Sequence, residues 1–270
     1  MQRRPNSQQG FTLVELVAVI VLLGVIGAAT TQFIRSSVGI YQDTARRDGL
    51  TQMGRFAVER VSRELRRALP GSVRVNNQAA MHCIEFMPIQ AASNYLGKVS
   101  ETPAVSSVTA VDFNYVFTAG DKLAIYTIEN NDVYAAGSQA IADISSVTVG
   151  SGGQQTISLN SANQFPQESP STRFYIVNEY VSFCATNGQL IRYEYASSAA
   201  SQPSPPVGGV ILAEAIRLQN QSGNAVNVFE FLPGTLQRAG IIRLNFNFRD
   251  DVVTDEWVQF SQDVSIRNTP

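Results

Sequence analysis

The carboxylate of Glu15 stands immediately before an apolar run, Leu16 to Ala29, that contains no charged residue. A carboxylate at the edge of a hydrocarbon layer is costly unless a cation pairs with it. Cleavage between Gly10 and Phe11, the recognisable processing junction, would free an amine close to this acid. A secretory signal peptide is instead cut after its apolar stretch, which is then lost. We therefore expect the mature chain to begin at Phe11, to keep the apolar segment and to use Glu15 for ion pairing.

Basic residues set the expected orientation of this segment. Arg3 and Arg4 precede the apolar run, and no acidic residue occurs before Glu15. Because basic residues favour the cytoplasmic side, we expect the first ten residues in the cytoplasm and the remainder beyond the membrane. An ordinary signal anchor has the same charge pattern, but it gives no reason for a carboxylate at this position.

Two cysteines, Cys83 and Cys184, both lie in expected strands. An exported domain meets an oxidising compartment, where such a pair is usually bridged. The bridge would close a loop of about 100 residues and stabilise the fold by roughly 4 to 5 kcal/mol. Strand alternation places Cys83 opposite Ile84 and Phe86, away from the more apolar face, so a bridge could link neighbouring strands or close a covered edge. Two buried free thiols are the alternative.

Catalytic and metal-binding patterns are scarce in this sequence. His82 is the single histidine, so the sequence has no histidine cluster that could bind a metal. His82 is also the one histidine that could act as the base of a catalytic nucleophile. It adjoins Cys83, but consecutive strand residues face opposite sides, and we expect a structural role. We predict no enzymatic activity and no cofactor, and we assign no metal site. A calcium site and a solvated loop both remain open for the densest acidic cluster, which comprises Asp250, Asp251, Asp255 and Glu256.

A single long helix is expected from Phe11 to Leu69, ending at Pro70-Gly71. It would extend over about 88 Å at ~1.5 Å per residue, whereas the hydrocarbon core of a bilayer is about 30 Å thick. Half of the helix must therefore lie outside the membrane. An apolar stripe continues there at Val38, Tyr41, Ala45, Met53, Phe56, Val61, Leu65 and Leu69. The opposite face carries Arg46, Arg47, Arg55, Glu59, Arg63 and Arg66.

Composition changes after Pro70, where Val, Ile, Thr, Tyr and Phe are interrupted by turn-forming residues, which indicates a β-rich domain. We expect a hairpin at Asn187-Gly188, since this pair fits a type I′ turn, and one buried face in Leu244 to Phe248. The predicted fold is α+β, with a long helix packed on a large antiparallel head of two sheets over residues 70–270. Strands are expected at Met81–Met87, Val111–Phe117, Lys122–Ile128, Ile144–Val149, Thr156–Leu159, Phe174–Ala185, Gln189–Tyr195, Val226–Phe231, Ile241–Phe248 and Glu256–Val264.

Charge is distributed unevenly along the chain. Residues 11–69 hold eight Arg against five acids, and residues 70–270 hold ten basic residues against seventeen acids. A basic amphipathic helix can bind nucleic acid or a lipid surface. Because the arginines are interleaved with acids and the head is acidic, we expect docking on neighbouring acidic domains and no nucleic-acid partner.

The segment Gly10-Phe11-Thr12-Leu13-Val14-Glu15, behind a short basic leader and before the apolar run, resembles the type IV prepilin signature. The resemblance implies a leader at 1–10, a membrane-spanning and filament-core half of the helix at 11–34, and an amphipathic half at 35–69. It implies that prepilin peptidase cuts after Gly10 and methylates the amine of Phe11. It also implies that Glu15 pairs with such an amine during assembly. The implied location is the bacterial inner membrane, with the head in the periplasm, and then the pilus.

Two further segments, Tyr41–Pro70 and Cys83–Ile89, resemble minor pilins of the mannose-sensitive haemagglutinin (MSHA) pilus system. They are similar more broadly to the J-class minor pseudopilins of type II secretion and to the pilin W class. This implies a low-copy subunit that primes assembly at or near the tip. The implied partners are the other minor and major pilins, the inner membrane and the pilus assembly platform. A secretion pseudopilin remains an alternative, as does an adhesive or ligand-binding tip subunit with loops such as Tyr95–Val105 or Ala196–Gly209.

Overall fold

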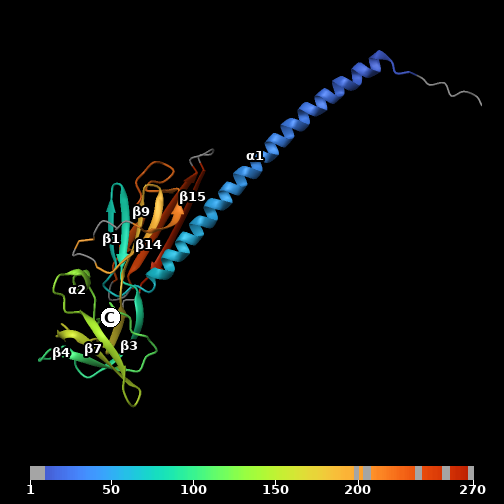
Figure 1. Cartoon of the computed structure of the whole chain (residues 1–270). Coiled ribbons are helices and arrows are strands. Elements are labelled where there is room, and N and C mark those ends of the chain that lie inside the picture. Colours follow the sequence, from blue (N-terminus) through green and yellow to red (C-terminus); the bar gives the residue numbers. More distant parts are fainter. Residues whose placement is uncertain (1–9, 198–200, 203–207, 235–238, 251–255, 267–270) are drawn as a thin grey trace, which may run out of the picture. The chain divides into compact units, whose positions relative to one another are not determined.

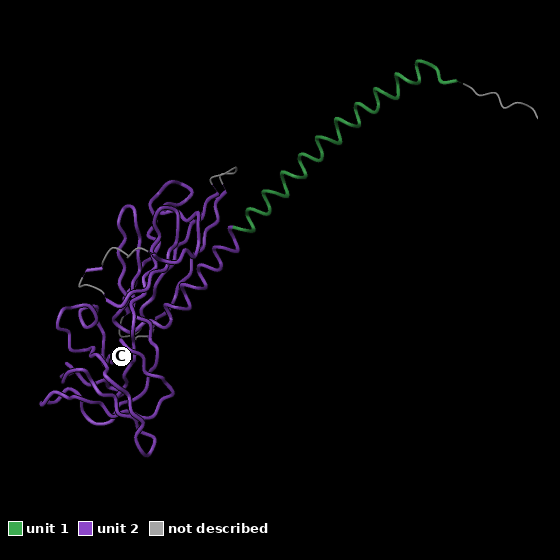
Figure 2. Tube along the Cα trace, in the orientation of Figure 1, with its two compact units in different colours: residues 1–49 green, residues 50–270 purple. Residues whose placement is uncertain are grey.

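The computed structural model describes residues 10–197, 201–202, 208–234, 239–250 and 256–266. The chain forms two compact units, residues 1–49 and residues 50–270 (Figure 2). Helix α1 (Leu13–Leu65) contributes to both of them (Figure 1). The second unit therefore begins inside the helix, at Leu50, and includes the last part of α1 as one of its core elements.

The second unit contains two antiparallel sheets and a closed barrel (Figure 1). The first sheet has the order β1 (Arg74–Gln78), β2 (Met81–Phe86), β9 (Tyr180–Thr186), β10 (Gln189–Tyr195) and β11 (Val210–Glu214). In the second sheet, β14 (Ile241–Asp250) pairs along its length with β15 (Glu256–Ser265), and it also pairs with β12 (Ile216–Arg217) and β13 (Phe229–Leu232). The barrel has the order β3 (Ile89–Leu96), β4 (Val105–Val111), β7 (Gln154–Asn163), β6 (Ile141–Val149), β5 (Lys122–Ala124) and β8 (Arg173–Val177), and the short helix α2 (Asn130–Tyr134) lies between β5 and β6 in sequence.

The predicted α+β fold, a long apolar helix followed by a large antiparallel head, is confirmed, and the barrel adds to the two expected sheets. In the first unit, every residue from Leu13 to Val38 is exposed. Within the described residues, α1 is the one helix long and apolar enough to cross a membrane. A helix that is apolar on all sides requires lipid or other apolar helices around it.

Helix α1 ends at Leu65, earlier than the predicted end at Leu69. The chain leaves the helix because the following residues pair with the connection between β2 and β3. The backbone N–H of Leu69 donates to the carbonyl of Met87 at 2.8 Å, and the carbonyl of Arg67 accepts from Ile89 at 2.7 Å. Pairing with a distant segment thus decides where the helix stops, before the local signal of Pro70-Gly71 acts.

The main core lies between the last four turns of α1 and the two sheets. Its helical members are Leu50, Ala57, Val58, Val61 and Leu65. Phe56, predicted on the apolar stripe, is instead 54 % exposed, because it lies about 100° around the helix from its neighbour Ala57. Separate clusters fill the barrel and the junction between barrel and sheets. Leu244, Phe246 and Phe248 are fully buried, as their alternation predicts.

The hairpin prediction is confirmed, since β9 and β10 join at Asn187 and Gly188 with φ values of 49° and 77°. The expected strand Val111–Phe117 is wrong. β4 ends at Val111, and Phe113, Tyr115 and Phe117 pack on the barrel core from an irregular segment. The expected strand Phe174–Ala185 is two strands, because β8 belongs to the barrel and β9 to the first sheet. Sequence patterns missed β1, β3, β11, β12, α2 and most of β4.

Candidate processing and assembly site

Thr12 and Glu15 form a reciprocal pair at the first turn of α1. The hydroxyl and the backbone N–H of Thr12 donate to Glu15 Oε2 at 3.2 and 3.4 Å, and the backbone N–H of Glu15 donates to Thr12 Oγ1 at 3.3 Å. This arrangement is a capping box, which satisfies donors that the first turn leaves free. The acid also lies at the positive end of the helix dipole. This capping role of Glu15 was not predicted from the sequence, although Thr-x-x-Glu before an apolar run is its signal.

The proposed processing junction precedes this cap. Gly10 is exposed and Phe11 is 80 % exposed, and both come before the first helical residue, Leu13. A peptidase needs an accessible peptide bond outside regular structure, and the bond between Gly10 and Phe11 meets both conditions. The amine that cleavage would free on Phe11 adjoins Thr12, next to the cap that holds Glu15.

Cys83 in β2 and Cys184 in β9 are directly paired residues of neighbouring strands, and a disulfide joins them. Both residues are buried. Ile84 follows Cys83, and Phe183 precedes Cys184. Both side chains point into the main core on the opposite face of the sheet. The bridge therefore links adjacent strands, which is one of the arrangements left open by the sequence.

A buried ion pair joins β1 to β2, the strand that also carries Cys83. Arg74 donates from Nε and Nη2 to both carboxylate oxygens of Glu85 at 3.0 to 3.1 Å, and Glu85 has no exposed surface. The guanidinium carbon of Arg74 lies 3.6 Å from the ring centroid of Tyr134 in α2. Burial, and then the charge of Glu85, raises the pKa of Tyr134, whose hydroxyl donates to the carbonyl of Ser72 at 2.6 Å. This cluster ties α2 to the first sheet.

His82 has a structural environment. It is buried, its Nδ1 accepts the backbone N–H of Val228 at 3.2 Å, and burial lowers the pKa of the imidazole. Its neighbour Cys83 is in a disulfide, so the two do not form a thiol-imidazole couple.

The acidic cluster considered for calcium is only partly described. Asp250 and Glu256 face each other across β14 and β15, whereas Asp251 and Asp255 lie outside the described residues. Within the described ranges there is no group of three or more His, Cys, Asp or Glu residues that could hold a metal ion.

Glu168 anchors the loop that follows β3. Its Oε1 accepts the N–H groups of Val99 and Ser100 at 2.8 and 2.9 Å, and its Oε2 accepts the hydroxyl of Tyr95 at 2.7 Å. Burial alone would raise the pKa of Glu168, but the hydrogen bonds from Ser100, Tyr95 and Val99 together outweigh it and lower the pKa to about 2. The proposed adhesive loop Tyr95–Val105 is thus fixed at its beginning.

Replacing Glu168 with Gln is expected to lower the free energy of unfolding by about 1 to 2 kcal/mol at pH 7, because partly exposed charge-assisted hydrogen bonds are lost. The pKa of Glu168 in the folded protein lies below its ordinary value of 4.5. The contribution of the ionised group is therefore complete above about pH 4.5 and falls as the pH drops toward 2. Urea unfolding at pH 7 and pH 3 measures the difference, which should be smaller at pH 3. An equal difference at both pH values contradicts the assignment.

The comparisons with known proteins point to the same N-terminal segment. Residues 5–31 match the family model described as the prokaryotic N-terminal methylation motif. No curated protein and no solved structure matches the chain. The motif is that of a structural family rather than a catalytic one, and it implies processing by prepilin peptidase and assembly with other pilins. The exposed apolar helix fits anchoring in the inner membrane. The chain therefore carries the N-methylation motif of prokaryotic type IV pilin-like proteins.

Proposed function

We propose that this protein is a minor pilin, of the MshO type, that takes part in priming and assembly of an MSHA-like type IV pilus at or near its tip. The observation that carries the proposal is the exposed junction Gly10–Phe11, which lies just before a capped helix with Glu15 in its first turn. Prepilin peptidase cleaves this junction and methylates Phe11. The head lies in the periplasm until the subunit enters the filament.

Glu15 has two successive partners in this proposal. Before assembly, its carboxylate accepts hydrogen bonds from Thr12 within its own helix. During assembly, it pairs with the amine of Phe11 from a neighbouring subunit, which sets the axial position of one helix against the next. An apolar helix exposed on all sides supports this role, because α1 needs lipid or neighbouring helices around it.

The fixed start of the loop after β3 favours a priming role over an adhesive one. Residues 96–98 and 101–104 of one candidate adhesive loop are exposed, but Tyr95 at its start is 1 % exposed and Glu168 holds Val99 in place, so this end of the loop cannot adapt. An adhesive surface is expected to present accessible side chains on a loop that can adapt. The second candidate loop, Ala196–Gly209, is mostly outside the described residues.

The test separates the charge of Glu15 from its capping role. Glu15→Gln keeps the capping box, because Gln serves as well as Glu at that position, but it removes the charge. Loss of a desolvated ion pair costs about 3 kcal/mol or more, so we expect cells with Glu15→Gln as their only copy to be nearly free of pili. Pilus counts and co-purification with the other pilins measure the effect.

Thr12→Ala is the matched control, because it breaks the capping box and leaves the charge. It should cost about 1 kcal/mol in helix stability and leave pilus numbers close to wild type. Normal pilus numbers and normal co-purification in Glu15→Gln would overturn the proposal. If Thr12→Ala lost its pili and Glu15→Gln kept them, the role of Glu15 would be helix capping and not ion pairing.

A further inference from the structure

Strand β15 forms an open edge of the second sheet. All of its residues pair with β14, and no other described strand pairs with it. The backbone N–H of Ile266 donates to the carbonyl of Gly240 at 3.0 Å, next to the paired residues Ile241 and Ser265. Because bonding alternates along an antiparallel pair, the even-numbered residues of β15 bond to β14. The backbone groups of Trp257, Gln259, Ser261 and Asp263 therefore point to the open side.

This edge lacks the usual protection against strand pairing. Natural edge strands carry charges, prolines or bulges, or are covered by another element. The central part of β15, Trp257–Gln262, contains no charged residue and no proline, and its pairing with β14 has no register shift. An unprotected edge of this kind is a ready site for adding a strand.

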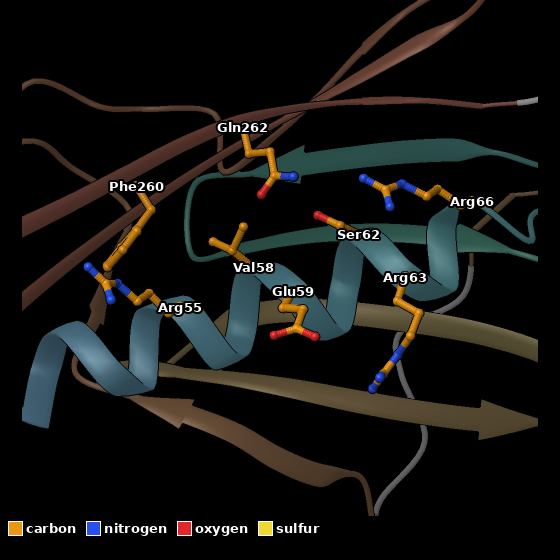
Figure 3. A pocket seen from close by; sticks show the side chains of 8 residues that line it. All are labelled: Arg55, Val58, Glu59, Ser62, Arg63, Arg66, Phe260 and Gln262. Carbon is orange, nitrogen blue, oxygen red and sulfur yellow. The ribbon is translucent and has the colours of Figure 1, made fainter.

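A groove of about 430 Å³ lies between this edge and the part of α1 that belongs to the second unit (Figure 3). Val58 on the helix and Phe260 on β15 form its apolar part. Ser62 and Gln262 reach into it from opposite walls, as Figure 3 shows. The groove therefore offers both apolar and hydrogen-bonding surface beside the open backbone edge.

The hydroxyl of Ser62, in the wall of the groove, lacks a hydrogen-bond partner. The residue is 3 % exposed, and its Oγ is buried without a hydrogen-bond partner among the described residues. An unsatisfied buried hydroxyl costs about 1 to 3 kcal/mol, so such groups are normally paired. A peptide placed beside β15 would bring backbone N–H and C=O groups to this wall of the groove.

The charge of the groove selects the chemistry of its occupant. Three exposed arginines, Arg55, Arg63 and Arg66, line it with one acid, Glu59. None of these arginines forms an ion pair with another described residue. Arg55 and Arg66 lie toward the two ends of the groove in Figure 3. This arrangement complements a chain that carries several carboxylates.

We propose that the open edge of β15 and this groove bind an extended acidic segment of another protein by strand addition. The backbone of that segment bonds to Gln259 and Ser261, one of its side chains contacts Val58 and Phe260, and its carboxylates reach the arginines of α1. The inference goes beyond the proposed function, because it depends on the second unit alone and holds whether or not the chain enters a pilus.

The test uses the full chain in detergent and two peptides that differ only in charge. The acidic probe is acetylated Asp-Thr-Asp-Thr-Val-Thr-Asp-Thr-Asp amide, which places its Val and all of its Asp residues on one face of the strand, and the control has Lys in place of each Asp. The acidic peptide should bind at least about tenfold more tightly, a difference of ~1.4 kcal/mol. It should also slow amide exchange at Gln259 and Ser261 and leave β11, an edge strand of the first sheet, unchanged. Equal binding of the two peptides, or protection elsewhere, would overturn the proposal.

Two variants examine the backbone edge and the arginines separately. Gln259→Pro removes an outward N–H and leaves the bonds to β14, so it should weaken binding at least about tenfold, whereas Gln259→Ala should bind like wild type. The double variant Arg63→Glu/Arg66→Glu changes an exposed helix face and should lose the preference for the acidic peptide. Wild-type binding by Gln259→Pro and by the double variant would contradict the inference. Self-association of the wild-type chain that is lost in Gln259→Pro would also contradict the inference, because the occupant of the edge would then be a second copy of this chain.

Discussion

Replacing Glu85 with Ala is expected to lower the free energy of unfolding of the head by about 3 to 5 kcal/mol. The variant leaves the guanidinium of Arg74 in a buried position without its carboxylate. Arg74 is 9 % exposed and Glu85 has no exposed surface, so bulk water reaches neither group in the folded protein. The aromatic ring of Tyr134 continues to contact the cation, but it cannot accept the hydrogen bonds that both oxygens of Glu85 accept.

Urea unfolding of the full chain in detergent, followed by the fluorescence of Trp257, measures this loss. Trp257 is the single tryptophan of the sequence, so the signal reports on the head alone. The control is Glu101→Ala, which breaks an exposed pair with Lys98 and should cost less than about 1 kcal/mol. The double variant Arg74→Met/Glu85→Leu should recover most of the loss, since apolar residues can replace a buried pair. Equal effects of Glu85→Ala and Glu101→Ala would contradict this account.

Removal of the disulfide in the double variant Cys83→Ala/Cys184→Ala is expected to cost about 4 to 5 kcal/mol. The bridge connects residues 101 positions apart and therefore restricts the unfolded chain strongly. Alanine is chosen because both sites are buried and a hydroxyl there would need a partner.

The same urea experiment measures the loss, with Ser182→Ala as a control that removes a neighbouring hydroxyl and keeps the bridge. Ser182 donates to the carbonyl of Ile84, so its loss should cost about 1 kcal/mol. Alkylation of the unreduced protein, followed by mass spectrometry, gives an independent result. Two thiols that react without reductant, together with a change below about 1 kcal/mol in the double variant, would contradict a stabilising bridge.

Local patterns predicted the features that depend on a few consecutive residues. The apolar run after Glu15 predicted a membrane-length helix, and Asn187-Gly188 predicted its turn because both residues adopt positive φ. The alternation from Leu244 to Phe248 predicted a buried face. In each case the physical cause lies within the segment itself.

Features that depend on distant pairing could not be read in the same way. The ion pair between Arg74 and Glu85 requires the register of β1 with β2, and β1 was not expected as a strand. The barrel requires β3, β4 and β8 to close with strands far along the chain, which alternation alone does not specify. The groove beside β15 likewise joins a helix and a strand about 200 residues apart. The Thr12–Glu15 cap is different, because its signal is local and was available in the sequence.

The mass of the N-terminal peptide, measured in cells with and without prepilin peptidase, tests the central claim most directly. The account predicts that the protein from cells with the peptidase begins at Phe11 and carries one methyl group on its amine. Without the peptidase, the chain should retain Gly10 and the residues before it. A chain that keeps its leader in both cells, or one that is cut after the apolar run of α1, would contradict the account.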